Sequence, residues 1–303
     1  MSGGAGWIVS LTGAVVILGG LRDVFHTLWH PAGRGDAITW ITAALWRLSR
    51  RVDAKGRITA VVGPLALVAV AGLWTVAIAV GWALVYWPHL PGGFSYAEGL
   101  EPPQRAGFLD ALYLSLVTMA TLGFGDIVPT AGWLRVATPV QALMGFALLT
   151  AVVSWVSQVY PSLTRRRALA LRLATVRDAG HRAGRLGPAV TAGLLMSLAD
   201  DVIQVRVDLT QHAETYYFHD GEDDSALAAM VEYAAGLALA GQSSAHAEVR
   251  TGAAMLGRAL EDFAEVLNRQ FLHRDGDSAL DVLRAYAADH GRLSRPGVGG
   301  RPM

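Results

Sequence analysis

Three long apolar stretches in the first half of the chain constrain its fold more than any other feature. They run from about residue 7 to 21, from 58 to 87 and from 136 to 160, and the second and third contain no charged residue. A helix needs about 20 apolar residues to cross a bilayer, so these two are long enough. The first is shorter, but it lacks the basic start and the small-residue cleavage pattern of a signal peptide. The sequence therefore predicts an all-α membrane protein with three membrane helices.

Basic residues in the connecting segments predict the orientation of these helices. Arg165–Arg167 follow the third stretch, whereas only Arg105 and Arg135 lie between the second and the third. The segment between the first and second stretches holds Arg34, Arg47, Arg50, Arg51, Lys55 and Arg57. Cytoplasmic loops carry an excess of Lys and Arg. We therefore expect both ends of the unit at 58–160 to lie on the cytoplasmic side of a cell membrane. Residues 37–51 predict an amphipathic helix on the membrane surface, with packing against the soluble part as the alternative.

The chain thus divides into three parts. Residues 1–57 hold the first membrane helix and the interfacial helix, residues 58–160 hold the second and third membrane helices, and residues 161–303 form a cytoplasmic helical domain. Its tail after Arg292 is expected to be disordered. Helices are predicted at 165–178, 189–217, 225–239, 245–271 and 278–290, and Ser278 and Asp281 have the spacing of a capping box. The acidic segment 220–224 lacks the spacing of an EF-hand. It is expected to be a solvated loop in which Asp224 or Ser225 caps the next helix.

Composition excludes several functional classes. Cysteine is absent, which excludes disulfides and thiolate metal sites. The formal net charge is zero and no basic stripe with interleaved aromatic residues occurs, so we expect no nucleic-acid partner. A nucleophile elbow, a P-loop and a metalloprotease motif are all missing, and neither an enzyme nor a cofactor is predicted.

The segment between the second and third stretches is expected to carry the function. Residues 108–120 read as an apolar helix that is too short to cross a bilayer, and the glycine-containing run Thr121–Gly125 follows it. Irregular backbone survives at membrane depth only where protein buries it or where it lines a watery path, so a re-entrant loop is predicted. Successive carbonyls point the same way only if alternate residues approach the left-handed conformation. Gly123 and Gly125 have that spacing, and glycine adopts the conformation at little cost.

Carbonyl oxygens arranged in this way would replace the water shell of a potassium ion, with the Thr121 hydroxyl at the inner end. One chain supplies one oxygen at each level, so four chains around a central axis are needed. The sequence therefore predicts a homotetramer in the lipid bilayer.

The run from Thr118 to Asp126, TMATLGFGD, resembles the signature of the potassium-channel pore-domain family. Its variant filter is similar to those of two-pore-domain and bacterial channels. The resemblance covers about 58–160 and implies an outer helix, a pore helix, a filter and an inner helix, with K⁺ as the permeant ion. It implies that Thr118 supports the filter and that Asp126 lies at its outer mouth. The ion-binding residues that it implies are Thr121, Leu122, Gly123, Phe124 and Gly125.

Two positions depart from the family pattern. Phe124 replaces the commoner tyrosine, and Val117 stands where some bacterial channels have a glutamate that pairs with the aspartate. Asp126 therefore needs another partner or water. The predicted function is passive, potassium-selective conduction. The alternatives are a nonselective cation channel, if these departures rearrange the filter, and a subunit of a potassium uptake transporter, whose chains carry four pore repeats.

Three weaker features complete the sequence-based hypotheses. Gly145 lies in the third stretch, where the inner helices of the family often have a hinge glycine, and a small residue that eases helix packing is the alternative. Asp23, His26 and His30 lie on one helical face and are candidate zinc ligands, or else polar groups at the membrane interface. The C-terminal domain is either a sensor for an unknown cytoplasmic ligand or an assembly scaffold, and the gating stimulus stays open.

Overall fold

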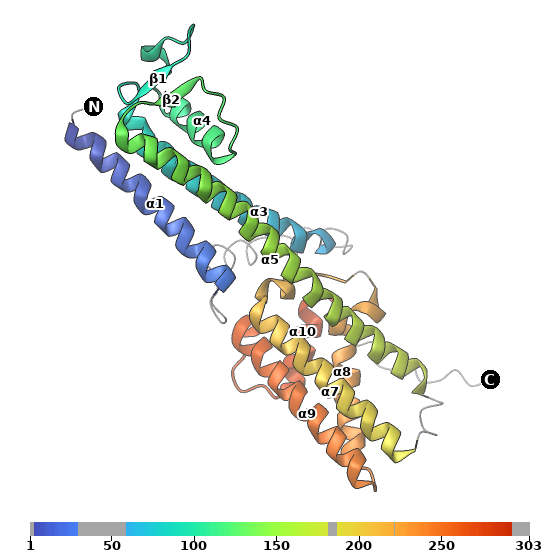
Figure 1. Ribbon diagram of the computed structural model, residues 1–303. Coiled ribbons are helices and arrows are strands. Elements are labelled where there is room, and N and C mark those ends of the chain that lie inside the picture. Colours follow the sequence, from blue (N-terminus) through green and yellow to red (C-terminus); the bar gives the residue numbers. More distant parts are fainter. Residues whose placement is uncertain (1–2, 30–58, 181–186, 221, 293–303) are drawn as a thin grey trace. The chain divides into compact units, whose positions relative to one another are not determined.

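A computed structural model describes residues 3–29, 59–180, 187–220 and 222–292, and helices dominate it (Figure 1). The chain forms two compact units. The membrane unit comprises Met1–Leu45 and Pro64–Ser157, and the C-terminal unit comprises Trp46–Gly63 and Gln158–Met303. The predicted interfacial helix at 37–51 and the tail after Arg292 lie outside the described residues.

Among the described residues, four helices are long and apolar enough to cross a membrane, at 4–28, 63–89, 132–178 and 188–211. The first three correspond to the predicted spans and are α1 (Gly3–Trp29), α3 (Thr59–Tyr86) and α5 (Gly132–Asp178). The sequence prediction of three membrane helices did not include the fourth, α7 (Pro188–Gln211). Its charges are dispersed among Ala, Leu and Val, so its hydropathy of 1.2 is the lowest of the four.

Close helix packing holds α1 against α3 within the membrane unit. A Cβ atom on Gly13 would lie 2.4 Å from the carbonyl oxygen of Gly81, and a Cβ on Gly81 would lie 2.7 Å from Cγ1 of Ile17. Small residues that let two backbones approach are typical of helix interfaces in membranes. This contact agrees with α1 as a membrane helix and supplies its packing partner.

Short elements connect α3 to α5. α4 (Phe108–Met119) agrees closely with the predicted short helix at 108–120, and it lies beside the strands β1 (Phe94–Tyr96) and β2 (Ile127–Pro129) (Figure 1). The strands pair antiparallel with Phe94 opposite Pro129. Two 3₁₀ turns, Trp87–His89 and Pro102–Arg105, complete the connection.

Helix α5 extends well beyond the predicted end of the third stretch at residue 160, and it includes the segment 165–178 that was expected as a separate helix. Pro161 removes one backbone donor, which usually favours a break. Ser162 and Leu163 are both only 2% exposed, so packing on the next turn offsets the lost hydrogen bond.

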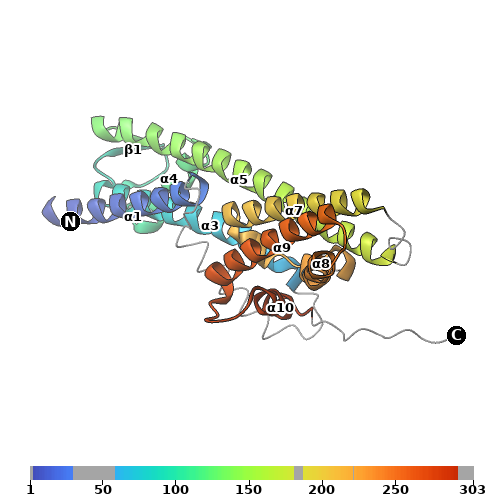
Figure 2. The same cartoon turned by 90° about the horizontal axis from the view of Figure 1, so that it is seen from below.

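The C-terminal unit is a helical bundle in which one helix, α9 (Ala247–Leu267), packs against α7, α8 (Leu227–Gln242) and α10 (Ala279–Asp289). α9 lies alongside α7 in both views (Figures 1 and 2). The other elements are the 3₁₀ turns Ala213–Tyr217 and Asp223–Ser225, and the π turn Asn268–Leu272. The predicted helices of this domain correspond to these elements within a few residues.

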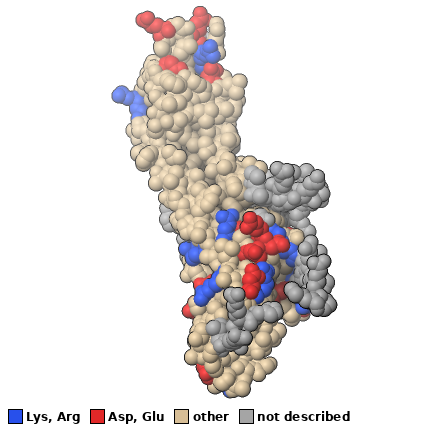
Figure 3. Space-filling view, turned by 90° about the vertical axis from the view of Figure 1, so that its right-hand side faces the viewer, with Lys and Arg blue, Asp and Glu red and all other residues tan. Residues whose placement is uncertain are grey.

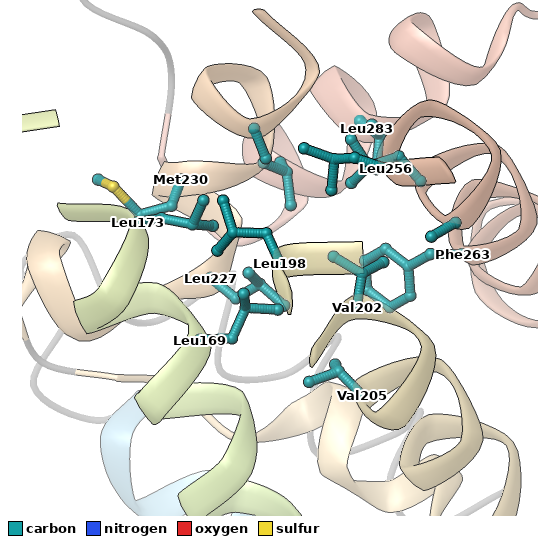
Figure 4. Packing of buried hydrophobic residues seen from close by; sticks show 14 of the residues in the cluster. Leu169, Leu173, Leu198, Val202, Val205, Leu227, Met230, Leu256, Phe263 and Leu283 are labelled. Atoms are coloured by element: carbon teal, nitrogen blue, oxygen red, sulfur yellow. The ribbon is translucent and has the colours of Figure 1, made fainter. Parts of the chain in front are cut away.

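Leucine, valine and phenylalanine side chains from several helices fill the core of the bundle (Figure 4). Val202 and Phe263 meet between α7 and α9, and Leu169 and Leu173 contribute from the end of α5. Surface charge follows the same division: the membrane unit is mostly uncharged along its helices, whereas Lys, Arg, Asp and Glu mix on the C-terminal unit (Figure 3).

The predicted cap of the last helix is confirmed. The Asp281 N–H donates to Ser278 Oγ at 3.3 Å, at the start of α10. The predicted cap of α8 is wrong, because Ala226 occupies the N-cap position and has no side chain to accept a hydrogen bond. Asp224 instead accepts from the Arg177 guanidinium at 2.9 Å.

Candidate functional site

Helix α4 presents its two faces to different surroundings. Its N-terminus is closed by Asp110, whose carboxylate accepts from the Gly107 N–H at 3.0 Å. Ala111, Leu114 and Thr118 are buried against the rest of the membrane unit, whereas Leu116 on the opposite face is 47% exposed. Thr118 thus lies where the sequence predicts a supporting residue, on the buried side of the helix end that leads into the glycine-containing run.

The run after α4 alternates between ordinary and left-handed backbone. The φ angles of Thr121, Gly123 and Gly125 are +58°, +52° and +78°. The left-handed glycines were expected from their spacing, but the left-handed Thr121 was not. A β-branched residue in this region is strained by about 1–3 kcal/mol and persists only where its surroundings fix it. This alternation of left-handed residues is the backbone pattern that the sequence analysis expects for carbonyls pointing to one side.

Two hydrogen bonds to α4 fix the Thr121 end of this segment. The Thr121 N–H donates to the Thr118 carbonyl and the Leu122 N–H donates to the Val117 carbonyl, both at 2.9 Å. These contacts hold the strained threonine in place. Within the described part of the chain, no donor reaches the carbonyl oxygens of Thr121, Leu122 or Gly123. The N–H groups of Thr121 and Leu122 are therefore engaged by α4, whereas these three carbonyl oxygens remain available to a cation.

The Gly125 end of the segment is held through the neighbouring Asp126. Its carboxylate accepts from the Tyr113 hydroxyl at 2.7 Å, and its carbonyl accepts from the Ala97 N–H at 2.9 Å, next to the paired strands. Tyr113, on α4, thus supplies the partner for Asp126 that Val117 cannot supply. The sequence analysis left this partner open, because the two residues are 13 positions apart and only the fold of the loop brings them together.

A buried chain of hydrogen bonds lies behind α4, and sequence reasoning missed it. The Tyr86 hydroxyl donates to Gln141 Oε1 at 2.6 Å, and Gln141 Nε2 donates to the Ser115 carbonyl at 3.0 Å and to Ser115 Oγ at 2.8 Å. The Ser115 hydroxyl donates onward to the Ala79 carbonyl at 2.7 Å. The signal that could have revealed it is an amide in an otherwise apolar span, because such polar groups are costly in a membrane and are retained for a role.

Gly145 lies where α5 approaches the end of α4. A Cβ atom on Gly145 would lie 2.2 Å from the Met119 carbonyl oxygen and 2.9 Å from its Cγ. Close packing therefore explains why position 145 holds a glycine, and the predicted hinge stays a hypothesis. A cavity of about 320 Å³ adjoins this contact and extends to Thr121, with Thr75 and Phe146 among its lining residues.

The candidate zinc ligands are not brought together in the described residues. Asp23 accepts from the indole N–H of Trp74 at 2.6 Å, on the neighbouring α3. His26 lies one turn further along α1, and His30 is outside the described residues. No group of three metal-ligating side chains occurs among the residues that the structure describes.

Arginines hold the acidic segment of the C-terminal unit, which was expected to be a solvated loop. Asp220 accepts from Arg166 at 2.9 Å and from Arg167 at 2.6 Å, and both the Asp220 and Arg166 side chains are less than one-tenth exposed. His219 and His290 stack next to this pair with ring centroids 5.3 Å apart. Burial lowers the pKa of both imidazoles, to about 4 for His290, and the charge of Arg166 adds to the effect.

Comparison with known proteins supports an assignment for the membrane unit. Residues 68–160 match a protein family described as Ion channel. The uncharacterized membrane protein YdjJ of Bacillus subtilis is 27% identical over 167 residues, which cover 54% of this chain and 47% of that protein. Two-pore potassium channel 5 of Arabidopsis thaliana is 41% identical over 59 residues, which cover 18% of this chain and 14% of that protein.

The chain thus spans less than half the length of either relative. No solved structure matches it significantly. The four apolar helices in the described part of the chain and the similarity to a membrane protein make it a multi-pass membrane protein. The segment from residue 68 to residue 160 matches this family of ion channels, which are not enzymes, and it is distantly similar to potassium channels.

Proposed function

We propose that this chain is one subunit of a homotetrameric, potassium-selective channel of the cell membrane, which conducts K⁺ passively. The residues proposed to bind the ion are Thr121, Leu122, Gly123, Phe124 and Gly125. The observation that carries the proposal is the alternation of left-handed residues in this segment, together with carbonyl oxygens that no described donor reaches. Potassium is bound by stacked rings of such oxygens in selective channels.

The tetramer follows from the incomplete coordination in one chain. Each level of the segment offers a single oxygen, and a dehydrated potassium ion needs several. The chain also exposes large apolar side chains next to the segment. Leu122 and Phe124 are 59% and 64% exposed, and Leu143 and Phe146 on α5 are 68% and 64% exposed. We assign part of this surface to neighbouring subunits, because closed symmetric assembly would cover it.

The proposed orientation has the C-terminal unit in the cytoplasm, with the domain division at about residues 57 and 160. The basic residues before α3 and within 165–167 support this through the positive-inside rule. Helix α7 meets the criteria for a span, but we assign it to the cytoplasmic bundle. Asp208 on α7 is 4% exposed and forms a bidentate pair with Arg165 at 2.7 Å, an arrangement that suits a soluble core better than lipid.

Two alternatives differ from this proposal in measurable ways. A nonselective cation channel would pass K⁺ and Na⁺ at similar rates, and a transporter subunit would not give channel-like unitary currents. The single filter-like segment in this chain argues against the transporter, whose chains carry four pore repeats. The potassium-channel name of one relative favours K⁺ over Na⁺.

Planar-bilayer recording of the purified protein tests the proposal. We expect unitary currents whose bi-ionic reversal potential favours K⁺ over Na⁺, from a particle with the mass of four chains. Gly123→Ala should reduce this selectivity, because alanine is strained at φ +52° although no atom lies within 4 Å of the added methyl. Gly99→Ala is the matched control, with φ +89° and similarly open space outside the filter segment.

Near-equal permeability for K⁺ and Na⁺ in the unmodified protein would refute potassium selectivity. A particle of one or two chains that still conducts would refute the tetramer. Equal effects of the two alanine variants would show that positive φ matters for folding alone and would remove the support for an ion-binding segment.

A further inference from the structure

Gln141 joins all three helices of the ion-channel domain through one side chain. Its amide accepts from Tyr86 on α3 and donates to Ser115 on α4, and it is itself part of α5. Tyr86, Ser115 and Gln141 are each completely buried. These contacts are separated by 26 to 55 positions in the sequence, so they report tertiary packing rather than local structure.

Both the amide oxygen and the amide nitrogen of Gln141 have hydrogen-bond partners. The amide oxygen accepts at 2.6 Å, and the amide nitrogen donates at 3.0 Å and 2.8 Å to two atoms of the same serine. A buried network of this kind fixes one arrangement of its members, because any shift leaves a polar atom unpaired in an apolar environment. The network therefore defines the position of α4 relative to α3 and α5 more sharply than apolar packing does.

The position of α4 directly affects the ion-binding segment, because hydrogen bonds join the two. Ser115 lies two residues before Val117, whose carbonyl accepts from the Leu122 N–H at 2.9 Å, and three before Thr118, whose carbonyl accepts from the Thr121 N–H at 2.9 Å. A displacement of this part of α4 moves both acceptors. The strained Thr121 depends on them, since its φ of +58° has to be fixed by its surroundings.

We propose that Gln141 is a positioning residue for selective conduction: it holds α4 through Ser115, and α4 in turn holds the inner end of the filter segment. This inference rests on the proposed function and deepens it. Gln141 touches no ion in this role. It acts through the carbonyls of α4, so its loss should change how long the filter segment stays conductive and how well it discriminates K⁺ from Na⁺.

The test compares Gln141→Leu with the unmodified tetramer in planar bilayers. Leucine keeps most of the volume but loses both amide contacts and leaves the Tyr86 hydroxyl without its acceptor. We expect a shift of about tenfold between conducting and non-conducting filter states, seen as faster current decay, and a lower K⁺/Na⁺ permeability ratio. Tyr86→Phe removes one hydroxyl only, and it should act in the same direction but more weakly.

Ser10→Ala is the matched control. Ser10 is 7% exposed and donates to the Val85 carbonyl at 3.2 Å, so it also forms a buried hydrogen bond to α3. It belongs to α1, and its hydrogen bonds, to Val85 and His89, do not involve α4. The permeability ratio is measured on open channels and does not depend on how many tetramers fold. A purely structural role would therefore lower the yield of both variants and leave the ratio unchanged.

Hydrogen exchange at residues 118–126 separates this inference from the proposed function. We expect faster exchange there in Gln141→Leu than in Ser10→Ala, whatever ion the protein conducts. Equal exchange, with decay and permeability ratio both unaltered in Gln141→Leu, would overturn the positioning role. Loss of K⁺ selectivity in the unmodified protein would instead overturn the proposed function, and the exchange measurement would still decide the role of Gln141.

Discussion

Replacing Gly145 with alanine tests how closely α5 must approach the end of α4. The added methyl would lie 2.2 Å from the Met119 carbonyl oxygen and 3.0 Å from the carbonyl carbon. Ordinary contacts between such atoms lie near 3.5 Å, so the helices have to separate by about 1 Å. These two atoms belong to the backbone, so a rotamer change of Met119 can relieve only the further contact with its Cγ at 2.9 Å.

The energetic cost follows from two opposing effects. Overpacking a well-packed interior destabilises by about 1–3 kcal/mol, whereas Gly→Ala in a helix stabilises by up to about 1 kcal/mol. We therefore expect a net loss of roughly 1–2 kcal/mol in Gly145→Ala. Met119 is followed directly by Ala120 and Thr121, so the displacement should also lower the K⁺/Na⁺ permeability ratio.

Gly72→Ala on α3 is the matched control, because nothing lies within 4 Å of the methyl it would add. Thermal unfolding of the purified protein and bilayer recording should be measured for both variants. The packing argument is refuted if Gly145→Ala is as stable and as selective as Gly72→Ala. A change confined to open probability, with stability and selectivity intact, would favour the hinge hypothesis for Gly145 instead.

Three further predictions concern ionisable groups. Tyr113→Phe removes the donor to Asp126, and we expect the current to decay up to about tenfold faster in symmetrical K⁺. Asp220→Ala leaves the buried Arg166 guanidinium without its carboxylate, and the C-terminal unit should lose about 3–5 kcal/mol of unfolding free energy in urea titrations. Burial lowers the pKa of His290 to about 4 from its ordinary 6.5, so the unfolded chain binds this proton first on acidification. Stability of α10 should be complete above pH 6.5 and fall by up to about 3 kcal/mol toward pH 4, as measured by hydrogen exchange.

Each of these has a clear contrary outcome. Unaltered decay in Tyr113→Phe would mean that the Asp126 contact does not stabilise the proposed filter segment. For Asp220, the control is Asp178→Ala, whose exposed pair with Arg177 should contribute at most about 1 kcal/mol. Equal losses in the two variants would contradict the argument from burial. His290→Gln should flatten the pH dependence of α10, and an unchanged slope in that variant would show that another group titrates.

Features with a local cause were predictable from the sequence. The short helix α4, the left-handed Gly123 and Gly125 and the cap formed by Ser278 all depend on residues within a few positions of one another. Hydropathy and glycine spacing carry such information directly.

The remaining features depend on contacts between distant segments. Gln141 is 55 positions from Tyr86, and nothing in the sequence near either residue indicates the other. The acidic segment that includes Asp220 looks solvated until the fold brings Arg166 to it from α5. Helix α5 continues past Pro161 because its next turn is buried, a tertiary effect that overrides the local preference of proline.

The left-handed Thr121 has a thermodynamic consequence for the ion itself. Its strain of about 1–3 kcal/mol has to be offset in the assembled protein. A ligand that binds only the native form at about 100 times its dissociation constant contributes about 2.7 kcal/mol, which is the same size. Under the proposed function, bound potassium is therefore part of what folds the filter, and the unfolding temperature of the tetramer should rise with K⁺ concentration.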